Sequence, residues 1–320
     1  MKITVIGAGR WGSCIAWYLD RSGHDVTIYG PKDTPDMISF TNTRSNGLIT
    51  LSDTTKLCYD LKEALCADVI VISIGSQGLR SLIDEINAID SETERTFILC
   101  MKGIEIESGM RLTEVVEEQS RFKVNVAVWI GPGHVQEFYR GIPNCMIIDS
   151  KDSELKKKLV DEFSSDLIRF YYGEDLLGNE VGAAAKNVIG IAAGMLDGMG
   201  LSSLKGALMS RGTREVSRLI KAMGGNELSA YGLCHLGDYE ATVFSQFSHN
   251  RMFGETYIKG ETYGKLAEGY YTAAALHNLC SKYNVEMPIS ETVYQILYNN
   301  VEPKKALDSL FKRPIKKELK

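Results

Sequence analysis

The chain begins Met1-Lys-Ile-Thr-Val-Ile-Gly-Ala-Gly-Arg-Trp-Gly12, a short apolar run that leads directly into a glycine-rich turn. This order predicts a strand, a tight turn and then a helix. Here Gly7 permits the turn, Gly9 lets a pyrophosphate approach the backbone, and Gly12 lets the helix pack on the strand. The free N–H groups at the start of the helix attract an anion. The pattern G-x-G-x-x-G therefore predicts a dinucleotide-binding turn, and a glycine turn without a ligand is the alternative.

The rest of the first half alternates β-branched runs with amphipathic stretches, which indicates βαβ units and a parallel sheet. Some strand candidates are apolar throughout, as expected when helices cover both sheet faces. Strands are predicted at 2–6, 25–29, 69–74, 96–101 and 124–130, and helices at 11–21, 61–67, 79–88 and 109–120. A shorter strand pair at 145–149 and 167–172 flanks a charged helix at 153–163. The predicted fold is α/β, a Rossmann fold with a doubly wound parallel sheet.

The second half, from about Asp175, consists of long helical segments separated by glycine-rich joints. We therefore expect a domain boundary near Gly173. Residues 1–173 would form the dinucleotide-binding domain, and residues 174–320 an all-α domain for substrate and catalysis. The lysine-rich segment 304–320 is expected to be a solvated tail.

Composition narrows the classes of protein further. The formal net charge is −5, with both signs mixed along the chain, which argues against a nucleic-acid partner. Seven cysteines without a CxxC pair or a Cys/His cluster indicate free thiols in a reducing compartment and no metal site. No signal peptide is visible, and the apolar run around Lys186 is too short and too rich in Gly and Ala for a membrane span. We expect a cytoplasmic protein.

Lys186 is the only ionisable side chain between Glu180 and Asp197, in a segment of small and apolar residues. Burying an isolated ammonium group is unfavourable or lowers its pKa, so a buried lysine needs a partner or a task. Lysine suits proton transfer near neutral pH because its pKa shifts readily on burial. The alternative is a helix that turns Lys186 outward to water.

Other polar residues follow strands or cluster near glycines. Lys102 comes directly after the strand at 96–101, where open parallel sheets bind ligands, although a surface lysine is the alternative. After the strand at 124–130, the loop Gly131-Pro-Gly133-His134 would carry backbone close to a cofactor. His134 is a candidate catalytic residue, and an exposed or hydrogen-bonded loop histidine is the alternative.

In the helical half, Asp238 and Thr242 stand four residues apart and would share a helix face. Asp238 is a candidate partner for Lys186, and a helix N-cap is the alternative. The segment Ser248-His-Asn-Arg251 supplies hydrogen-bond donors and positive charge that suit a phosphate.

The end of the second strand, Ile28-Tyr-Gly-Pro-Lys-Asp33, bears on the choice of cofactor. An Asp or Glu usually stands where Gly30 is, and it holds the adenosine 2′-hydroxyl. An acid there would repel a 2′-phosphate, whereas Lys32 can pair with one. NADP(H) is therefore favoured, and Asp33 leaves NAD(H) open.

The order of these motifs resembles that of the NAD(P)-dependent glycerol-3-phosphate dehydrogenase family, from Gly7 to about Thr272. The family order is G-x-G-x-W-G, K-G, G-P-S, K-N in a small-residue helix with D-G-x-G, R-G, G-D-x-x-x-T, S-R-N-R and E-G. The matching residues here are 7–12, 102–103, 131–132, 186–187 with 197–200, 211–212, 237–238 with 242, 250–251 and 268–269. The resemblance implies hydride transfer between NAD(P)(H) and the pair dihydroxyacetone phosphate and sn-glycerol 3-phosphate.

The resemblance also implies roles for single residues. Lys186 would be the general acid/base at the C2 oxygen, with Asp238 beside it and Lys102 contacting substrate and cofactor. The glycine turn, the end of the second strand and the resemblance together predict the cofactor contacts. These are Gly7, Gly9, Arg10, Trp11, Gly12, Lys32, Lys102, Gly131, Val135, His249, Leu266 and Glu268. Substrate contacts would come from Lys102, Gly131, Gly133, Lys186, Asp238, Thr242, Ser248, His249 and Asn250. The expected partner is a small phosphorylated ketose or polyol, and a homodimer is left open.

Two residues depart from the family pattern. His249 stands where the family has the first arginine of S-R-N-R, a clamp for substrate phosphate and a cofactor contact, and Gly133 stands where it commonly has serine. An imidazole replaces a bidentate guanidinium poorly. These departures leave open a paralogue acting on another ketose or polyol phosphate and an NADP-binding regulator without catalysis. A β-hydroxyacid-type dehydrogenase, which also places a helix lysine near substrate, is a further alternative.

Overall fold

An eight-stranded sheet in the order β3-β2-β1-β4-β5-β6-β7-β8 organises the first half of the computed structural model, which describes residues 1–315 and 317–318. The strands are β1 Lys2–Ile6, β2 Asp25–Tyr29, β3 Lys56–Cys58, β4 Val69–Ile72, β5 Arg95–Leu99, β6 Val124–Ile130, β7 Asn144–Ser150 and β8 Ile168–Tyr172. The chain winds from β1 to β2 and β3 in one direction and from β4 onward in the other. The point of reversal, between β1 and β4, is where such sheets bind ligands.

Helices cover both faces of the sheet. They are α1 Arg10–Arg21, α2 Pro35–Thr43, α3 Leu61–Ala64, α4 Leu79–Ile89, α5 Leu112–Gln119 and α7 Ser153–Phe163. Strand β4 shows why both faces are apolar, since Val69 and Val71 belong to one buried cluster and Ile70 and Ile72 to the other. The predicted α/β class and doubly wound arrangement are confirmed.

The prediction of a wholly parallel sheet is wrong for the last two strands. Strands β1 to β6 run parallel, but β7 pairs antiparallel with β6, and β8 follows β7 in parallel. The link between β6 and β7 contains only the five-residue helix α6, Val135–Tyr139. Such a helix is roughly 7 Å long, whereas a seven-residue strand spans about 23 Å, so the chain re-enters the sheet at the end it left.

Most predicted elements of this half are present with shifted ends. The helix predicted at 109–120 begins at Leu112, the helix at 61–67 ends at Ala64, and the strand at 69–74 ends at Ile72. Helices α2 and α6 and strand β3 were not predicted from the sequence. Strand β3 is a three-residue edge strand, and α2 is rich in Ser, Asn and Thr, so neither carries a strong periodic pattern.

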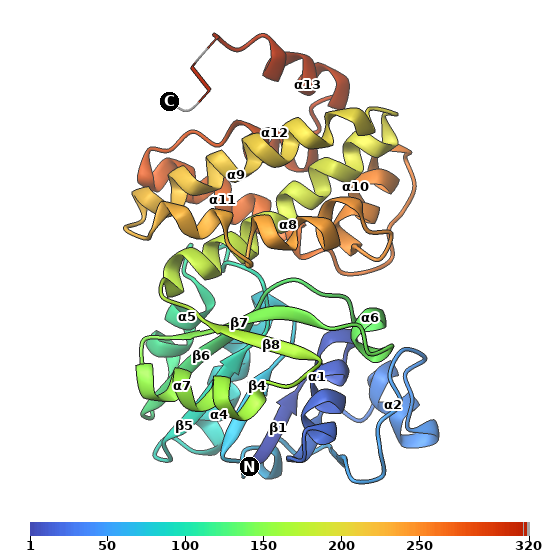
Figure 1. Cartoon of the computed structure of the whole chain (residues 1–320), viewed down its shortest axis with the longest axis vertical. Helices are drawn as coiled ribbons and strands as arrows, with labels where there is room; N and C mark the ends of the chain where they lie inside the picture. The colour runs from blue at the N-terminus through green and yellow to red at the C-terminus, as the bar shows by residue number, and fades with distance from the viewer. Residues whose placement is uncertain (316, 319–320) are drawn as a thin grey trace.

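The second half is helical, as predicted, and forms a layer above the sheet half (Figure 1). Its helices are α8 Leu176–Gly198, α9 Lys205–Ala222, α10 His249–Ile258, α11 Glu268–Tyr283, α12 Pro288–Asn299 and α13 Pro303–Phe311, with short turns η4 Leu236–Asp238 and η5 Glu240–Phe244. Over the described residues, no helix is both long enough and apolar enough to cross a membrane. The segment predicted as a solvated tail, 304–320, is in part helix α13, although Ala306 is its only buried described residue. Residues 316, 319 and 320 of that segment lie outside the described residues.

Helix α8 packs backbone to backbone against α10. A Cβ atom on Gly194 would lie 1.8 Å from the Arg251 carbonyl oxygen, and one on Gly254 would lie 2.1 Å from the Ile191 carbonyl oxygen. No side chain fits at these crossings. The small residues of α8 are therefore required by its contact with α10.

Replacing Gly194 with alanine should separate the two helices and lower the free energy of unfolding by about 2–3 kcal/mol, as overpacking of a tight contact does. The matched control is Gly206→Ala in α9, where a Cβ would meet no atom within 4 Å. Because alanine is the better helix former, the control should be neutral or up to about 1 kcal/mol more stable. Urea unfolding of the three proteins measures both values, and equal midpoints would contradict the packing argument.

Candidate active site

Lys186 lies in the middle of α8 and is buried, with only 6% of its surface exposed. Its Nζ donates a hydrogen bond of 2.7 Å to Thr242 Oγ1 and lies 3.0 Å from Asp238 Oδ2. Both partners come from the short turns η4 and η5, which pack against α8. The alternative of an outward-facing lysine is therefore wrong.

Asp238 is shared between two lysines. The Nζ atom of Lys102 lies 2.7 Å from the same Oδ2 atom and donates a second hydrogen bond of 2.6 Å to the Gly131 carbonyl. Lys102 follows β5 and Gly131 follows β6, so the carboxyl ends of two strands meet the helical half here. Asn187 reinforces the contact, since its Nδ2 donates to the Lys102 carbonyl at 3.0 Å. Neither a surface role for Lys102 nor a capping role for Asp238 is what the structure shows.

Burial sets the proton affinity of Lys186. Loss of hydration lowers the pKa of its ammonium group to about 8, the nearby Asp238 carboxylate opposes this change, and Lys102 adds to it. An amine with a pKa near 8 exchanges protons readily at neutral pH. The site thus holds a group that can both donate and accept a proton.

Glycines of α8 bring further polar residues beside Lys186. A Cβ on Gly190 would lie 2.7 Å from Thr242 Cγ2 and 3.3 Å from Asn250 Cβ, so both residues pack on α8 one turn beyond the lysine. Asn250 Oδ1 accepts a hydrogen bond of 2.9 Å from the Gly269 amide at the start of α11. Ser248 is buried and accepts the Arg251 amide at 3.3 Å as the N-cap of α10.

The segment 248–251 carries less free positive charge than its residue types predict. Arg251 Nη1 pairs with Asp197 and with Glu255, each at 2.8 Å. Burial first, and the charges of Arg10 and Lys265 second, lower the pKa of His249 to about 4, so its ring is neutral at pH 7. The His249 Nδ1 atom lies 2.7 Å from the Tyr263 hydroxyl.

The glycine turn after β1 fits a dinucleotide. A Cβ on Gly7, which has a φ of +107°, would lie 2.2 Å from the Ser73 carbonyl oxygen, and one on Gly12 would lie 1.9 Å from the Gly7 oxygen. The fold itself requires these two glycines. A Cβ on Gly9 would meet no atom within 4 Å, so its surface is open to a ligand. Helix α1 begins at this turn with no side-chain cap and no acid in its first turn, which leaves its N–H groups available to an anion.

The packing at the end of β2 explains why glycine, and not an acidic residue, stands at position 30. A Cβ on Gly30 would lie 2.8 Å from Met37 Cγ and 3.6 Å from Ala8 Cβ, so α2 fills the space in which an acidic side chain would begin. Lys32 and Asp33 are exposed in the turn that follows. Both side chains therefore remain accessible to an adenosine ribose.

The loop after β6 is closely packed. Gly133 has a φ of +140°, and a Cβ on it would lie 2.3 Å from the Phe138 ring, so this packing leaves no room for a serine. His134 is 9% exposed and lies edge-on to Phe247, with ring centroids 5.6 Å apart. In the described structure the buried Nε2 atom of His134 has no hydrogen-bond partner. The alternative of an exposed histidine is wrong.

Among the remaining predicted cofactor residues, Val135 is buried at the start of α6 and Leu266 is exposed. The Glu268 carboxylate accepts hydrogen bonds from the Ser76 amide at 3.0 Å and the Ser76 hydroxyl at 2.5 Å. Sequence reasoning missed Ser76, although its place just after β4 is the same signal that identified Lys102. It also missed Tyr263, for which the sequence holds no comparable signal.

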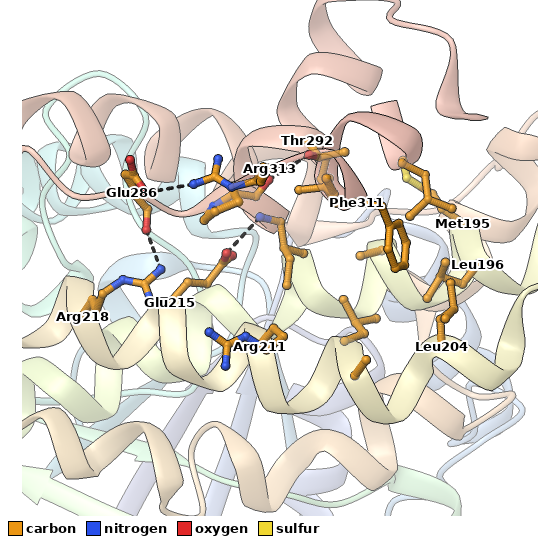
Figure 2. Close-up of a pocket in the computed structure, with 18 of the residues that line it drawn as sticks. Met195, Leu196, Leu204, Arg211, Glu215, Arg218, Glu286, Thr292, Phe311 and Arg313 are labelled. Carbon is orange, nitrogen blue, oxygen red and sulfur yellow. Dashed lines mark hydrogen bonds and ion pairs between the residues drawn. The ribbon is translucent and has the colours of Figure 1, made fainter. Parts of the chain in front are cut away.

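A large cavity of about 1120 Å³ lies between α8, α9, α12 and α13 (Figure 2). Its walls combine apolar side chains such as Leu204 and Phe311 with Arg211, Arg218 and Arg313. Arg211, part of the R-G motif, lines this cavity, and its Nη1 donates to the Glu318 carbonyl at 3.0 Å. Glu215 in this cavity accepts hydrogen bonds from the Ile289 and Ser290 amides. Its carboxylate is thus satisfied by structural contacts.

The glycine turn at the switch point of the sheet and the buried lysine cluster at the strand ends indicate a dinucleotide-dependent oxidoreductase with a helical second half. The chain belongs to the NAD-dependent glycerol-3-phosphate dehydrogenase family. The model of the family's N-terminus matches residues 2–156, and that of its C-terminus matches residues 175–308. The β-hydroxyacid type is therefore not the family of this chain.

Known relatives agree over the full length. A glycerol-3-phosphate dehydrogenase [NAD(P)+] of Bacillus cereus (strain B4264) is 36% identical, covering 99% of this chain and 97% of the relative. One of Fusobacterium nucleatum is 34% identical, covering 100% and 99%. The crystal structure of glycerol-3-phosphate dehydrogenase from Coxiella burnetii has a TM-score of 0.89 and 29% identity, covering 98% of this chain and 99% of that one. The dehydrogenase of Saccharomyces cerevisiae, with a TM-score of 0.77 and 23% identity over 96% and 98%, shares the fold.

The titration of Lys186 tests the electrostatics of the site. Its midpoint should fall near pH 8, and Asp238→Asn should move it lower, because the carboxylate that favours the ammonium form is lost while burial and Lys102 remain. Lysine ¹³Cε NMR measures the midpoint, with the signal assigned by its absence in Lys186→Met. A midpoint at the ordinary lysine value, or a rise in Asp238→Asn, would show that this account of the site is wrong.

Proposed function

We propose that this chain catalyses the NAD(P)H-dependent interconversion of dihydroxyacetone phosphate and sn-glycerol 3-phosphate, the activity that its relatives' names state. The observation that carries the proposal is the buried Lys186–Asp238–Lys102 cluster at the carboxyl ends of β5 and β6. The glycine turn after β1, where the surface of Gly9 is open to a ligand, supports binding of the dinucleotide. The proposed division of labour assigns binding of the dinucleotide to residues 1–173 and catalysis to residues 174–320.

In this proposal Lys186 is the general acid/base. Its ammonium group donates a proton to the C2 oxygen during reduction, and the neutral amine accepts one during oxidation. When bound, the nicotinamide cofactor would supply the hydride for reduction and accept it in oxidation. Asp238 and Thr242 hold the Lys186 Nζ atom in place, and Lys102 adds positive charge where the oxygen becomes negative. Because the amine of Lys186 has a pKa near 8, it can donate a proton in reduction and accept one in oxidation near neutral pH.

His249 supports a second candidate, a paralogue that acts on another ketose or polyol phosphate. The neutral, Tyr263-bonded imidazole does not offer the charge of an arginine. Steady-state rates with dihydroxyacetone phosphate and a longer ketose phosphate, each with NADH and NADPH, would separate the two. A regulator without catalysis would bind cofactor and turn over neither substrate.

Lys186→Ala should lower kcat by roughly 10²- to 10⁴-fold, the usual contribution of a general acid or base. The dissociation constant for NADPH should stay within about twofold, since Lys186 is assigned to the substrate. In the wild type, reduction should slow as pH rises through about 8, because the ammonium form is lost, and oxidation should quicken over the same range. Absorbance assays at 340 nm measure kcat of the variant and the pH profiles of reduction and oxidation. Normal turnover in the variant would refute the assigned role.

We further propose a preference for NADP(H), supported by Gly30 and the exposed Lys32. Lys32→Ala should weaken NADPH binding roughly five- to tenfold, as loss of a charge-assisted contact to the 2′-phosphate would do, and leave NADH unchanged. Lys62→Ala, an exposed lysine in α3, is the control. Fluorescence titration gives the dissociation constants. Equal binding of both cofactors, unaltered in Lys32→Ala, would remove the preference.

A further inference from the structure

The proposed reaction places several phosphate groups in the site, and each needs cations or N–H donors. The nearby cations can be counted. Lys186 and Lys102 both share Asp238, and Arg251 is paired with Asp197 and Glu255. His249 is neutral at pH 7. Apart from Arg211, which lines the cavity described above, the cations in the motifs of the helical half are thus each in contact with a carboxylate or uncharged.

Arg10 is different, because its guanidinium contacts neutral groups. Nη2 donates to Gln136 Oε1 at 2.8 Å and Nη1 donates to the Phe247 carbonyl at 3.3 Å. Within residues 1–315 and 317–318, no carboxylate lies within ion-pair distance of Arg10. Burial is the main influence on the Arg10 guanidinium and lowers its pKa. Because no carboxylate of the described residues faces it, this partly buried positive charge has no counter-ion among them. Such a charge favours binding of an anion.

The position of Arg10 matches that need. It is the first residue of α1, directly after the open surface of Gly9, and its side chain reaches the loop before Ser248 and His249. The guanidinium therefore bridges the dinucleotide turn and the helical half. A guanidinium has five N–H donors, and the two hydrogen bonds leave others free for a ligand.

An unpartnered polar group beside Arg10 gives independent support. His134 is 9% exposed, its Nε2 atom has no partner in the described structure, and its ring lies against Phe247, whose carbonyl Arg10 binds. The Nε1 atom of Trp11, the next residue of α1, is also buried without a partner. A buried ring nitrogen left without a partner beside a cation is a mark of a ligand site.

We propose, on the basis of the proposed function, that the Arg10 guanidinium is the phosphate clamp of this chain and supplies the charge that His249 does not. The ligand chemistry is a phosphate oxygen held between the glycine turn and the segment 247–249. Two groups of the reaction offer it, the pyrophosphate of the dinucleotide and the phosphate of the substrate. Lys265 also acts on His249, but it is exposed, so water and salt screen its charge.

The test compares wild type with Arg10→Gln, Arg10→Lys and the control Arg21→Gln, an exposed arginine at the other end of the same helix. Dissociation constants for NADPH and inorganic phosphate are measured by fluorescence titration and calorimetry. KM is measured with dihydroxyacetone phosphate and with unphosphorylated dihydroxyacetone. Arg10→Gln should weaken phosphate-dependent binding roughly 10- to 100-fold, and Arg10→Lys should recover part of the loss, because lysine keeps the charge but not the fork.

These measurements distinguish the two sources of the phosphate group. If KM rises for dihydroxyacetone phosphate but not for dihydroxyacetone, the clamp holds the substrate; if the dissociation constant of NADPH rises, it holds the cofactor. His249→Arg introduced into Arg10→Gln should restore part of either loss. If Arg10→Gln matches Arg21→Gln in all binding constants, the clamp is refuted. Should wild type turn over neither substrate, the proposed function fails, and the NADPH and phosphate titrations still decide on Arg10.

Discussion

One carboxylate oxygen, Asp238 Oδ2, holds the two halves of this molecule together at the site. It lies between the ammonium groups of Lys186 in α8 and Lys102 after β5. Two positive charges and one negative charge leave a net positive site at the strand ends, which suits an anionic substrate and a developing oxyanion. Removing the carboxylate would leave two ammonium groups facing one another in a desolvated setting, so the cluster depends on Asp238 more than on either lysine alone.

The composition of α8 follows from this arrangement. For Asp238 and Thr242 to reach Lys186, the turns η4 and η5 must pack directly on the helix, and the glycine at 190 provides the space. Helix α10 approaches at Gly194, and the start of α11 approaches the Asn187 carbonyl at Gly269, where a Cβ would lie 2.6 Å from that oxygen. The small residues that isolate the lysine in the sequence are the same residues that let its partners come close.

The fold and the centre of the site could be predicted where the signal is local. The strand, turn and helix at residues 1–12 and the lysine among small residues are readable because each pattern is contained in a few turns of chain. The antiparallel β7 was missed, because strand direction depends on the path of the link through α6. The neutral state of His249 was missed as well, because it results from burial and from the charges of Arg10 and Lys265, which no sequence pattern connects.

Whether a charged side chain is free to bind a ligand is equally hard to predict from the sequence. Arg251 has the residue type and spacing of a phosphate ligand, yet its guanidinium pairs with Asp197, 54 residues away in the sequence, which also binds Lys205 at 2.6 Å. Those contacts tie the end of α8 to α9 and α10, so the arginine serves packing of the helical half. A motif therefore identifies candidate cations, but whether a cation is available depends on the carboxylates that folding brings to it. In this chain Arg10, a residue of the sheet half, has no carboxylate partner among the described residues, so the proposed phosphate clamp lies beside the glycine turn rather than at Arg251.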